Sequence, residues 1–392
     1  MAEHQSNDRH SRKAHFALET TEPTSFGHGW ISGTISSILG VVGLGTVACF
    51  QFPELTMPAL RGLYPVPAIR AALHFVLVAS FLMGTISICL RQNKALGLIG
   101  ITLTLFAALL GGSQVPIGGE VTTEPFLGLD WFLLNLIVYS VVYIPLERLF
   151  AKYPDQPTFR KEWRVDLAYF FFNTLFIQVT SFLVMQPSVV FFSWARLAPI
   201  QEAVSGIPLL IQIPLVLLVA DLAQYWAHRA FHEVPALWRF HAIHHSVESM
   251  DWLAGARLHV VDAVVTRGLT YIPLYVLGFS QPAIYSYLVV VVVQSTFIHA
   301  NVRWEFPRLR RFIATPCFHH WHHTAEKHAL DKNYSVHSPL WDWLFGTLYL
   351  PDAWPKKYGI CGERDVPTTW ARQLVYPFRR LKHLASEQQA DV

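Results

Sequence analysis

Histidine carries the strongest chemical signal in this chain of 392 residues, which contains 19 of them. Thirteen of these histidines lie between residues 228 and 337, and most are clustered there at short spacings. Residues three or four positions apart are neighbours on a helix surface, so an H-x3-H pair and two H-x2-H-H triplets each place their imidazoles on one face. These groups are His228 and His232; His241, His244 and His245; and His319, His322 and His323.

A further histidine, His299, stands alone at the end of an apolar stretch. Imidazole nitrogens bind iron, zinc, copper and nickel. If the three faces and His299 converge, eight or nine imidazoles surround one pocket. A single metal ion takes about four to six ligands, so this number favours two ions. Carboxylates are nearly absent from the groups, unlike the glutamate-rich di-iron sites of four-helix bundles, and no H-E-x-x-H zinc protease motif is present.

The composition indicates the surroundings of these histidines. Hydrophobic residues make up 52% of the chain and charged residues only 15%, whereas soluble domains carry about 25% charged residues. This excludes an ordinary soluble enzyme, and the apolar content excludes disorder for most of the chain. A net charge of +3 gives no indication of a nucleic-acid partner. The four cysteines are widely separated, so they suggest neither a disulfide framework nor a thiolate metal site.

Six apolar stretches approach the roughly 20 residues that a helix needs to cross a bilayer. They lie at about 31–50, 71–90, 95–112, 131–146, 167–190 and 207–226. We expect helices because lipid offers no partner to an unpaired backbone amide. Lysine and arginine are concentrated in alternate loops, so the positive-inside rule predicts a multi-pass integral membrane protein with a cytoplasmic N-terminus. The same rule places everything after residue 226 in the cytoplasm.

One more apolar stretch, at about 269–298, is interrupted by Pro273 and by the segment 278–282. These breakers predict a helical hairpin that enters the membrane and returns to the same face. Its flanks, His259 and His299, therefore lie on the cytoplasmic side. The predicted fold class is all-α: a polytopic membrane helical bundle with a cytoplasmic, histidine-lined di-metal site.

The chain divides into four predicted regions. They are a polar tail at 1–30, an extra transmembrane region of unknown role at 31–125, a catalytic domain at 126–352 and a polar tail at 353–392. Gly40, Gly43 and Gly45 lie inside an apolar stretch. We interpret them as sites of close helix packing rather than as a nucleotide-binding loop.

The order and spacing of the histidines resemble the fatty acid hydroxylase / sterol desaturase superfamily of membrane di-iron oxygenases. The likeness covers about 131–352 and includes the segments 315–323, 331–334 and 340–347. It implies two iron ions that use O2 and externally supplied electrons to hydroxylate or desaturate a lipid, such as a sterol or a fatty acyl chain. The implied ligands, which are also the implied catalytic residues, are His228, His232, His241, His244, His245, His299, His319, His322 and His323.

His259 is a less regular match, because Val-Val-Asp262 follows it where the family often has Pro-x-Glu. We include His259 as a tenth predicted metal ligand. Ligating imidazoles usually donate their other N–H to a carboxylate or carbonyl. We therefore expect Asp221 to orient one of the ligands, with Asp262, Asp331 and Asp342 as further candidates. Arg257, near His259, is expected to pair with one of these acids.

The chain shows no nucleotide-binding or haem-domain motif, so the electrons are expected from a separate ferredoxin, reductase or b-type cytochrome. Basic residues of the predicted cytoplasmic face offer it a docking surface: Arg303, Arg308, Arg310 and Arg311. The other expected partners are the membrane and a lipid substrate. No nucleic-acid partner is expected. Two other function classes stay open. A haem-binding electron carrier would use two or four histidines and show a Soret band, and a metal transporter would need polar residues deep in several spans.

Overall fold

The computed structural model describes residues 30–90, 94–119, 126–362 and 366–379. Within these ranges the regular secondary structure is helical, joined by loops, with two isolated β-bridges and no strand, which confirms the predicted all-α class. Nearly all of the predicted tail at 1–30, and the last residues of the predicted tail at 353–392, lie outside the described residues. The contacts divide the chain into two compact units: unit 1 holds residues up to 138 together with 174–178, and unit 2 holds the remainder.

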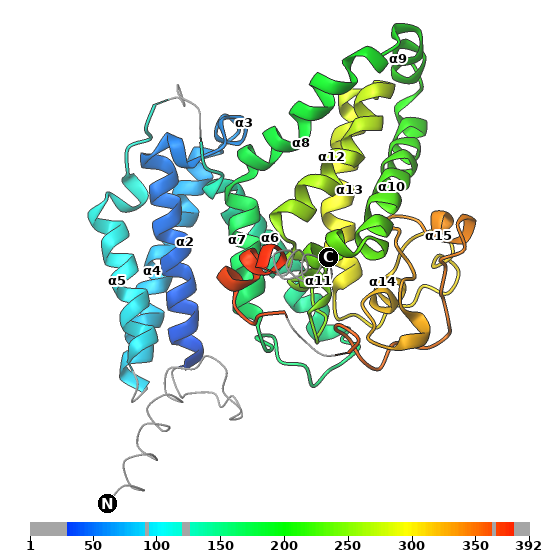
Figure 1. The fold of residues 1–392 in the computed structure, drawn as a ribbon. Helices are drawn as coiled ribbons and strands as arrows, with labels where there is room; N and C mark the ends of the chain where they lie inside the picture. The colour runs from blue at the N-terminus through cyan, green and yellow to red at the C-terminus, as the bar shows by residue number, and fades with distance from the viewer. Residues whose placement is uncertain (1–29, 91–93, 120–125, 363–365, 380–392) are drawn as a thin grey trace, which may run out of the picture. The chain divides into compact units, whose positions relative to one another are not determined.

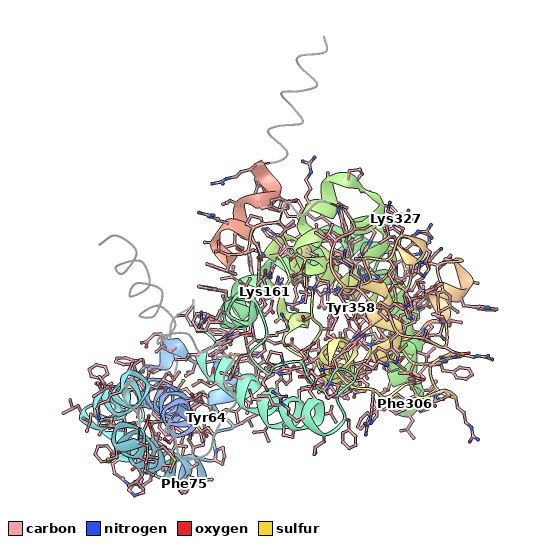
Figure 2. The ribbon with its side chains drawn as sticks, turned by 90° about the horizontal axis from the view of Figure 1, so that it is seen from below. Tyr64, Phe75, Lys161, Phe306, Lys327 and Tyr358 are labelled. Carbon is pink, nitrogen blue, oxygen red and sulfur yellow. The ribbon has the colours of Figure 1, made fainter. Side chains whose placement is uncertain are left out.

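Unit 1 is built around three helices, α2 (Trp30–Gln51), α4 (Val66–Leu90) and α5 (Ala95–Leu109), as Figure 1 shows. The short helix α3 (Pro58–Arg61) precedes α4. The outer faces are apolar: Phe75 of α4 is 73% exposed and points away from the helices (Figure 2).

Small and hydroxyl residues hold the three helices of unit 1 together. Ser36 and Ser80 each donate a side-chain hydrogen bond to the other's carbonyl, at 2.7 and 2.8 Å. Thr104 donates to the Ser80 hydroxyl at 2.7 Å. A Cβ added at Gly40 would lie 3.0 Å from the Gly100 carbonyl. The close packing predicted for the Gly40 stretch is therefore confirmed, and it follows the pattern of small residues at membrane helix interfaces.

Unit 2 begins in the second half of α6 and, apart from residues 174–178 where α7 ends and α8 begins, contains the rest of the helices. They are α6 (Leu129–Leu149), α7 (Trp163–Leu175), α8 (Ile177–Phe192), α9 (Ala198–Ser205), α10 (Leu209–Glu233), α11 (Pro235–His245), α12 (Val260–Leu277), α13 (Gln281–His299), α14 (Pro316–His322) and α15 (Leu340–Leu344).

The predicted pair of helices is present as α12 and α13, and the turn between them lies in the predicted segment 278–282, whereas Pro273, predicted as a breaker, lies inside α12. Gly278 ends α12 in the left-handed conformation (φ 73°), which glycine adopts without a Cβ clash, and its N–H bonds to the Leu274 carbonyl at 3.2 Å. The start of α12 and the end of α13 then lie at the same end of the pair. The helices α10 and α13 run toward that end, and α11 and α14 lie there (Figure 1).

Seven described helices are long and apolar enough to cross a membrane. They are Ile31–Gln51, Val66–Leu90, Ala95–Gln114, Leu129–Leu149, Leu209–Glu233, Val260–Leu277 and Gln281–His299. Five of the six predicted stretches correspond to one of these helices. The stretch at 167–190 is instead divided between α7 and α8 at Phe176, and residues 182–195 and 198–205 form a pair bent by 116°.

Candidate metal centre

Nine of the ten predicted histidines converge in two groups, and within each group one nitrogen per residue lies within 4.8 Å of all the others. The first histidine group consists of His228, His232, His241, His245 and His322. The second histidine group consists of His244, His299, His319 and His323. Both groups belong to unit 2.

The two H-x2-H-H triplets are shared between the groups in opposite senses. On α11, His241 and His245 are four residues apart and join the first group, whereas His244 joins the second. At α14, His319 and His323 are four residues apart and join the second group, whereas His322 joins the first. The ends of α10 and α13 supply the remaining three histidines. Two short helices thus connect both groups.

Backbone carbonyls determine which nitrogen of several imidazoles carries the proton. His228 Nδ1 lies 2.7 Å from the Tyr334 carbonyl, and His299 Nδ1 lies 2.6 Å from the Ser295 carbonyl. His244 Nδ1 is 3.1 Å from the carbonyl of Arg257. A carbonyl oxygen only accepts, so each Nδ1 donates its proton. The Nε2 atoms of these residues therefore present unprotonated lone pairs.

Those lone pairs face one another. In the first group, His228 Nε2 is 3.0 Å from His241 Nε2, and the Nδ1 of His241 donates to Asp262 at 2.6 Å. In the second group, His244 Nε2 is 3.2 Å from His299 Nε2. Two nitrogens without protons cannot form a hydrogen bond, and a cation between them removes their repulsion. The donor set therefore fits a metal ion in each group.

Two further buried nitrogens support this fit. His232 Nε2 and His322 Nε2 have no hydrogen-bond partner within the described part of the chain. Buried polar atoms of folded proteins are almost always satisfied, so such orphaned nitrogens suggest a missing ligand. Burial lowers the pKa of His322 to about 3 and also lowers the pKa of His245 and His323. These residues are therefore neutral, and neutral imidazole is the form that binds metal.

Two of the candidate acids contact histidines of the first group. Asp262 accepts from His241, and Asp331 accepts from His232 Nδ1 at 3.1 Å. The expectation for Asp221 is wrong: its carboxylate accepts instead from the backbone N–H groups of residues 336, 337 and 338, at 2.8–3.0 Å. Asp342 likewise binds the backbone of residues 334 and 335. These two acids fix the loop after α14, whereas the first two orient imidazoles.

The structure also corrects the expectation for His259, which lies outside both histidine groups. It is the N-cap of α12, and its Nδ1 accepts from the Val261 N–H at 3.1 Å. Its Nε2 lies 3.2 Å from the Leu374 carbonyl, to which it donates. Both ring nitrogens are therefore occupied, and no lone pair is left for a metal ion.

A buried ion-pair network that no sequence pattern predicted supports the second group. Arg257, whose carbonyl accepts from His244, pairs with Asp166 and with Glu162, the latter at 2.8 Å. Arg160 pairs with the same Asp166 at 2.6 Å and with Asp251 at 2.7 Å. Arg257 thus pairs with acids other than the predicted ones. Asp166 precedes it by 91 residues, so spacing along the chain gave no signal.

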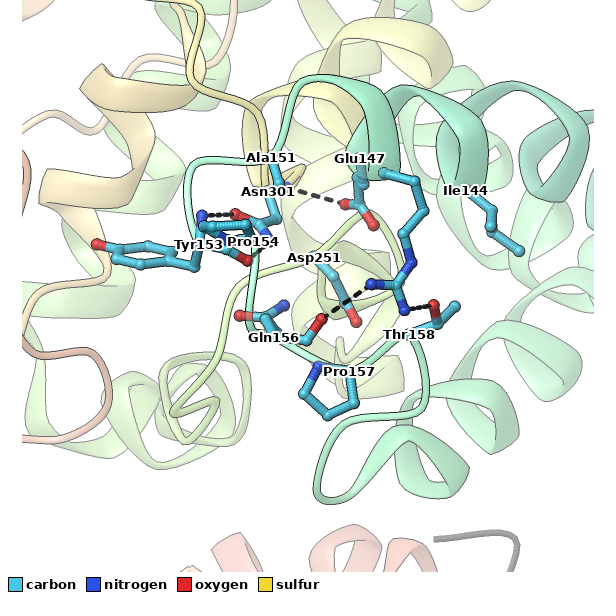
Figure 3. Close-up of a pocket in the computed structure, with 11 residues that line it drawn as sticks. Ile144, Glu147, Ala151, Tyr153, Pro154, Gln156, Pro157, Thr158, Asp251 and Asn301 are labelled. Carbon is cyan, nitrogen blue, oxygen red and sulfur yellow. Dashed lines mark hydrogen bonds between the residues drawn. The ribbon is translucent and has the colours of Figure 1, made fainter. Parts of the chain in front are cut away.

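A second support holds the end of α13. Glu147, near the end of α6, accepts from the Asn301 N–H at 2.9 Å, as the dashed line in Figure 3 shows. The Asn301 side chain also exchanges two hydrogen bonds with the backbone of Tyr153, at 2.9 and 3.0 Å. These contacts line a small polar pocket and fix the chain two residues beyond His299.

Comparison with known proteins agrees with this geometry. The profile of the fatty acid hydroxylase family matches residues 213–347, which include both histidine groups. The chain is 30% identical to ornithine lipid hydroxylase OlsE of Rhizobium tropici over 264 residues, which cover 63% of this chain and 77% of that protein. The chain therefore belongs to the fatty acid hydroxylase superfamily, and its apolar helices make it a multi-pass membrane protein.

Other relatives match shorter stretches. Human alkylglycerol monooxygenase is 33% identical over 128 residues, which are 32% of this chain and 28% of that protein. The fatty acid hydroxylase vlmA of a Lecanicillium species is 29% identical over 139 residues, 33% of this chain and 42% of that protein. The chain thus spans less than half the length of either relative. No solved structure matches it.

Proposed function

We propose that this protein is a di-iron lipid hydroxylase, an oxidoreductase that uses O2 and externally supplied electrons. The observation that carries the proposal is the convergence of nine buried imidazoles in two groups with facing, unprotonated Nε2 atoms. Two ions, rather than one, suit a first group of five nitrogens and a second group of four. Iron suits imidazole ligands, and zinc lacks the redox chemistry that an oxygenase needs.

In this proposal the two histidine groups hold one iron ion each, and the bound pair supplies the redox chemistry that activates O2. The protein's own residues orient the imidazoles and exclude water. Asp262 and Asp331 hold the Nδ1 protons of His241 and His232, which keeps the Nε2 atoms available. The side chain of His232 is only 3% exposed. A buried site of this kind protects a reactive oxidant from water.

The substrate is proposed to be a membrane lipid. Helices α10, α12 and α13 connect the apolar region with the histidine groups, so a lipid can approach the site from the bilayer. The relatives are named as hydroxylases and monooxygenases, which favours hydroxylation over desaturation. Ornithine lipid is the first candidate to test, because its hydroxylase shares the longest of the alignments given above.

The remaining parts of the proposal concern placement and partners. The catalytic domain is residues 126–352, and its histidine groups and the N-terminus lie on the cytoplasmic side. The electron donor is a separate ferredoxin, reductase or b-type cytochrome. Basic side chains near the site provide a docking surface for it, since Arg303, Arg308 and Arg311 are exposed. The extra spans at 31–125 have no assigned role.

The function is tested by comparing the lipids of the native host with and without the gene under aerobic growth. The proposal predicts a lipid that is heavier by one oxygen atom only when the gene is present. Complementation with His244→Ala should not restore it. A loss of two hydrogens instead would indicate desaturation, and an unchanged lipid profile would contradict an oxygenase. A Soret band in the purified protein would favour the haem carrier.

A further inference from the structure

A chain of aromatic rings leads away from the first histidine group. The ring of Tyr334 lies 5.1 Å from His232 and 5.8 Å from His228, measured between centroids. The ring of Tyr225 follows at 5.8 Å from Tyr334, and Trp226 at 5.5 Å from Tyr225. These are contact distances for aromatic pairs. Tyr225 is fully buried, whereas Trp226 is 48% exposed, so the chain of rings leads from the histidines to the surface.

Tyr334 and Tyr225 differ in whether the phenolic hydroxyl has an acceptor for its proton. The Tyr334 hydroxyl is buried and has no hydrogen-bond partner among the described residues. The Tyr225 hydroxyl lies 3.0 Å from Thr347 Oγ1, and Thr347 donates to the Asp342 carboxylate at 2.7 Å. A threonine hydroxyl has one proton, so Tyr225 must be the donor to Thr347. Tyr225 therefore has a directed path for its proton, and Tyr334 has none.

Other contacts hold this path in place. Arg229 Nη1 donates to the Tyr225 oxygen at 3.2 Å. Asp342 is fully buried and also accepts from the Tyr334 N–H at 2.7 Å. The same carboxylate thus fixes the backbone of Tyr334 and accepts a hydrogen bond from the threonine that contacts Tyr225.

We propose that Tyr225 is a redox-active residue that protects the metal centre. This inference rests on the proposed function. With no lipid bound, Tyr225 gives up one electron through the Tyr334 ring to the oxidising equivalent that bound iron would generate with O2. The Tyr225 proton moves to Thr347, and the Thr347 hydroxyl proton moves to Asp342. The products are a neutral tyrosyl radical and a protonated Asp342, in place of an oxidised histidine.

The external one-electron donor then restores the resting state. One electron returns to Tyr225, directly or through Trp226, and the two protons return along Asp342 and Thr347. Charge and protons therefore balance over the cycle, and the oxidant is reduced by one equivalent for each electron delivered. Tyr334 serves as the ring between the partners and never needs to lose its proton.

The test uses the full-length, iron-loaded protein in phosphatidylcholine nanodiscs, reduced with dithionite, exposed to O2 without substrate and frozen. Electron paramagnetic resonance of the wild type should show a tyrosyl radical whose signal narrows with ring-deuterated tyrosine. Tyr225→Phe should lose the signal, and Thr347→Val should lower its yield because the proton acceptor is gone. Tyr271→Phe, a tyrosine that contacts Tyr275 on α12, is the matched control and should keep it.

A second readout is the oxidation of histidine side chains, measured by mass spectrometry of the peptides that contain α11 and α14. It should rise faster in Tyr225→Phe than in the wild type, with equal iron content. An unchanged radical in Tyr225→Phe overturns the inference. So does an iron-loaded wild type that hydroxylates lipid without forming a radical, although the proposed function then stands. A wild type that binds no iron contradicts both.

Discussion

At the scale of single residues, the site depends on proton positions in the imidazole rings. Carbonyl and carboxylate acceptors hold protons on Nδ1. This leaves the Nε2 atoms facing in two pairs, His228 with His241 and His244 with His299. His259 shows the opposite arrangement, with both nitrogens used in capping α12 and in contacting residue 374. The surroundings of a histidine, and not its place in a motif, therefore decide whether it can bind metal.

The contrast between His244 and His259 gives a direct prediction. His244→Ala should lower bound metal and abolish activity while membrane insertion is unchanged, because the second group loses one of its four nitrogens. His259→Ala should keep its metal, although it loses about 1 kcal/mol of stability from the helix cap and more from the cavity that its buried ring leaves. Metal content and thermal unfolding of the two purified variants would check this. Equal metal loss in both would show that His259 is also a ligand.

The orienting carboxylates give a second prediction. Asp262→Asn removes the charge that holds His241, and such changes typically weaken metal affinity by about 10–100-fold. Titration of the metal-free protein with ferrous iron would measure the effect. Asp352→Asn is the control, because that carboxylate is 91% exposed and pairs with Arg310 at the surface. Equal iron affinity of the two variants would contradict the orienting role of Asp262.

At the scale of elements, spacing predicted which histidines converge but not how they are shared. Helical spacing predicted that residues of α11 lie together, because positions three and four apart are always neighbours. It did not predict that His244 joins one group while His241 and His245 join the other, since this depends on where α13 and α14 lie. The support from Asp166 of α7 depends on a contact across 91 residues, and no local pattern indicates it.

The ion pairs of α7 predict a stability effect. Asp166→Ala leaves Arg160 and Arg257 buried without this partner, and breaking one member of such a network costs about 3–5 kcal/mol. We expect a lower Tm and weaker metal binding, because the Arg257 carbonyl holds His244. Lys161→Ala is the control, since its pair with Glu248 is exposed. A Tm equal to that of the control would contradict the structural role of the network.

Unit 1 offers a prediction about packing. A Cβ at Gly100 of α5 would lie 1.9 Å from Ser36 Oγ and 2.6 Å from the backbone of the same residue, so Gly100→Val should separate α2 from α5. The expected result is a lower yield of folded protein in detergent, as judged by size-exclusion chromatography. Gly119→Val, which meets nothing within 4 Å, is the control. Equal yields of the two variants would show that α2 and α5 tolerate separation.

At the scale of the whole molecule, composition predicted a membrane protein because low charge and long apolar stretches leave few alternatives. The seven apolar helices agree with this prediction. The number of basic residues in a loop did not indicate which of them are exposed to solvent. Arg160, which contributed to the predicted cytoplasmic charge, is only 2% exposed and belongs to the network beneath the second histidine group. A buried arginine and a solvated one look identical in the sequence.

The most direct test of the account is the metal content of the full-length protein, purified without chelators or affinity tags that bind metal. Elemental analysis should find two iron ions per chain, one for each histidine group. A double variant, His241→Ala with His244→Ala, removes a nitrogen from each group and should lose both. A wild type without stoichiometric transition metal, or with one ion per chain, would contradict the di-metal site.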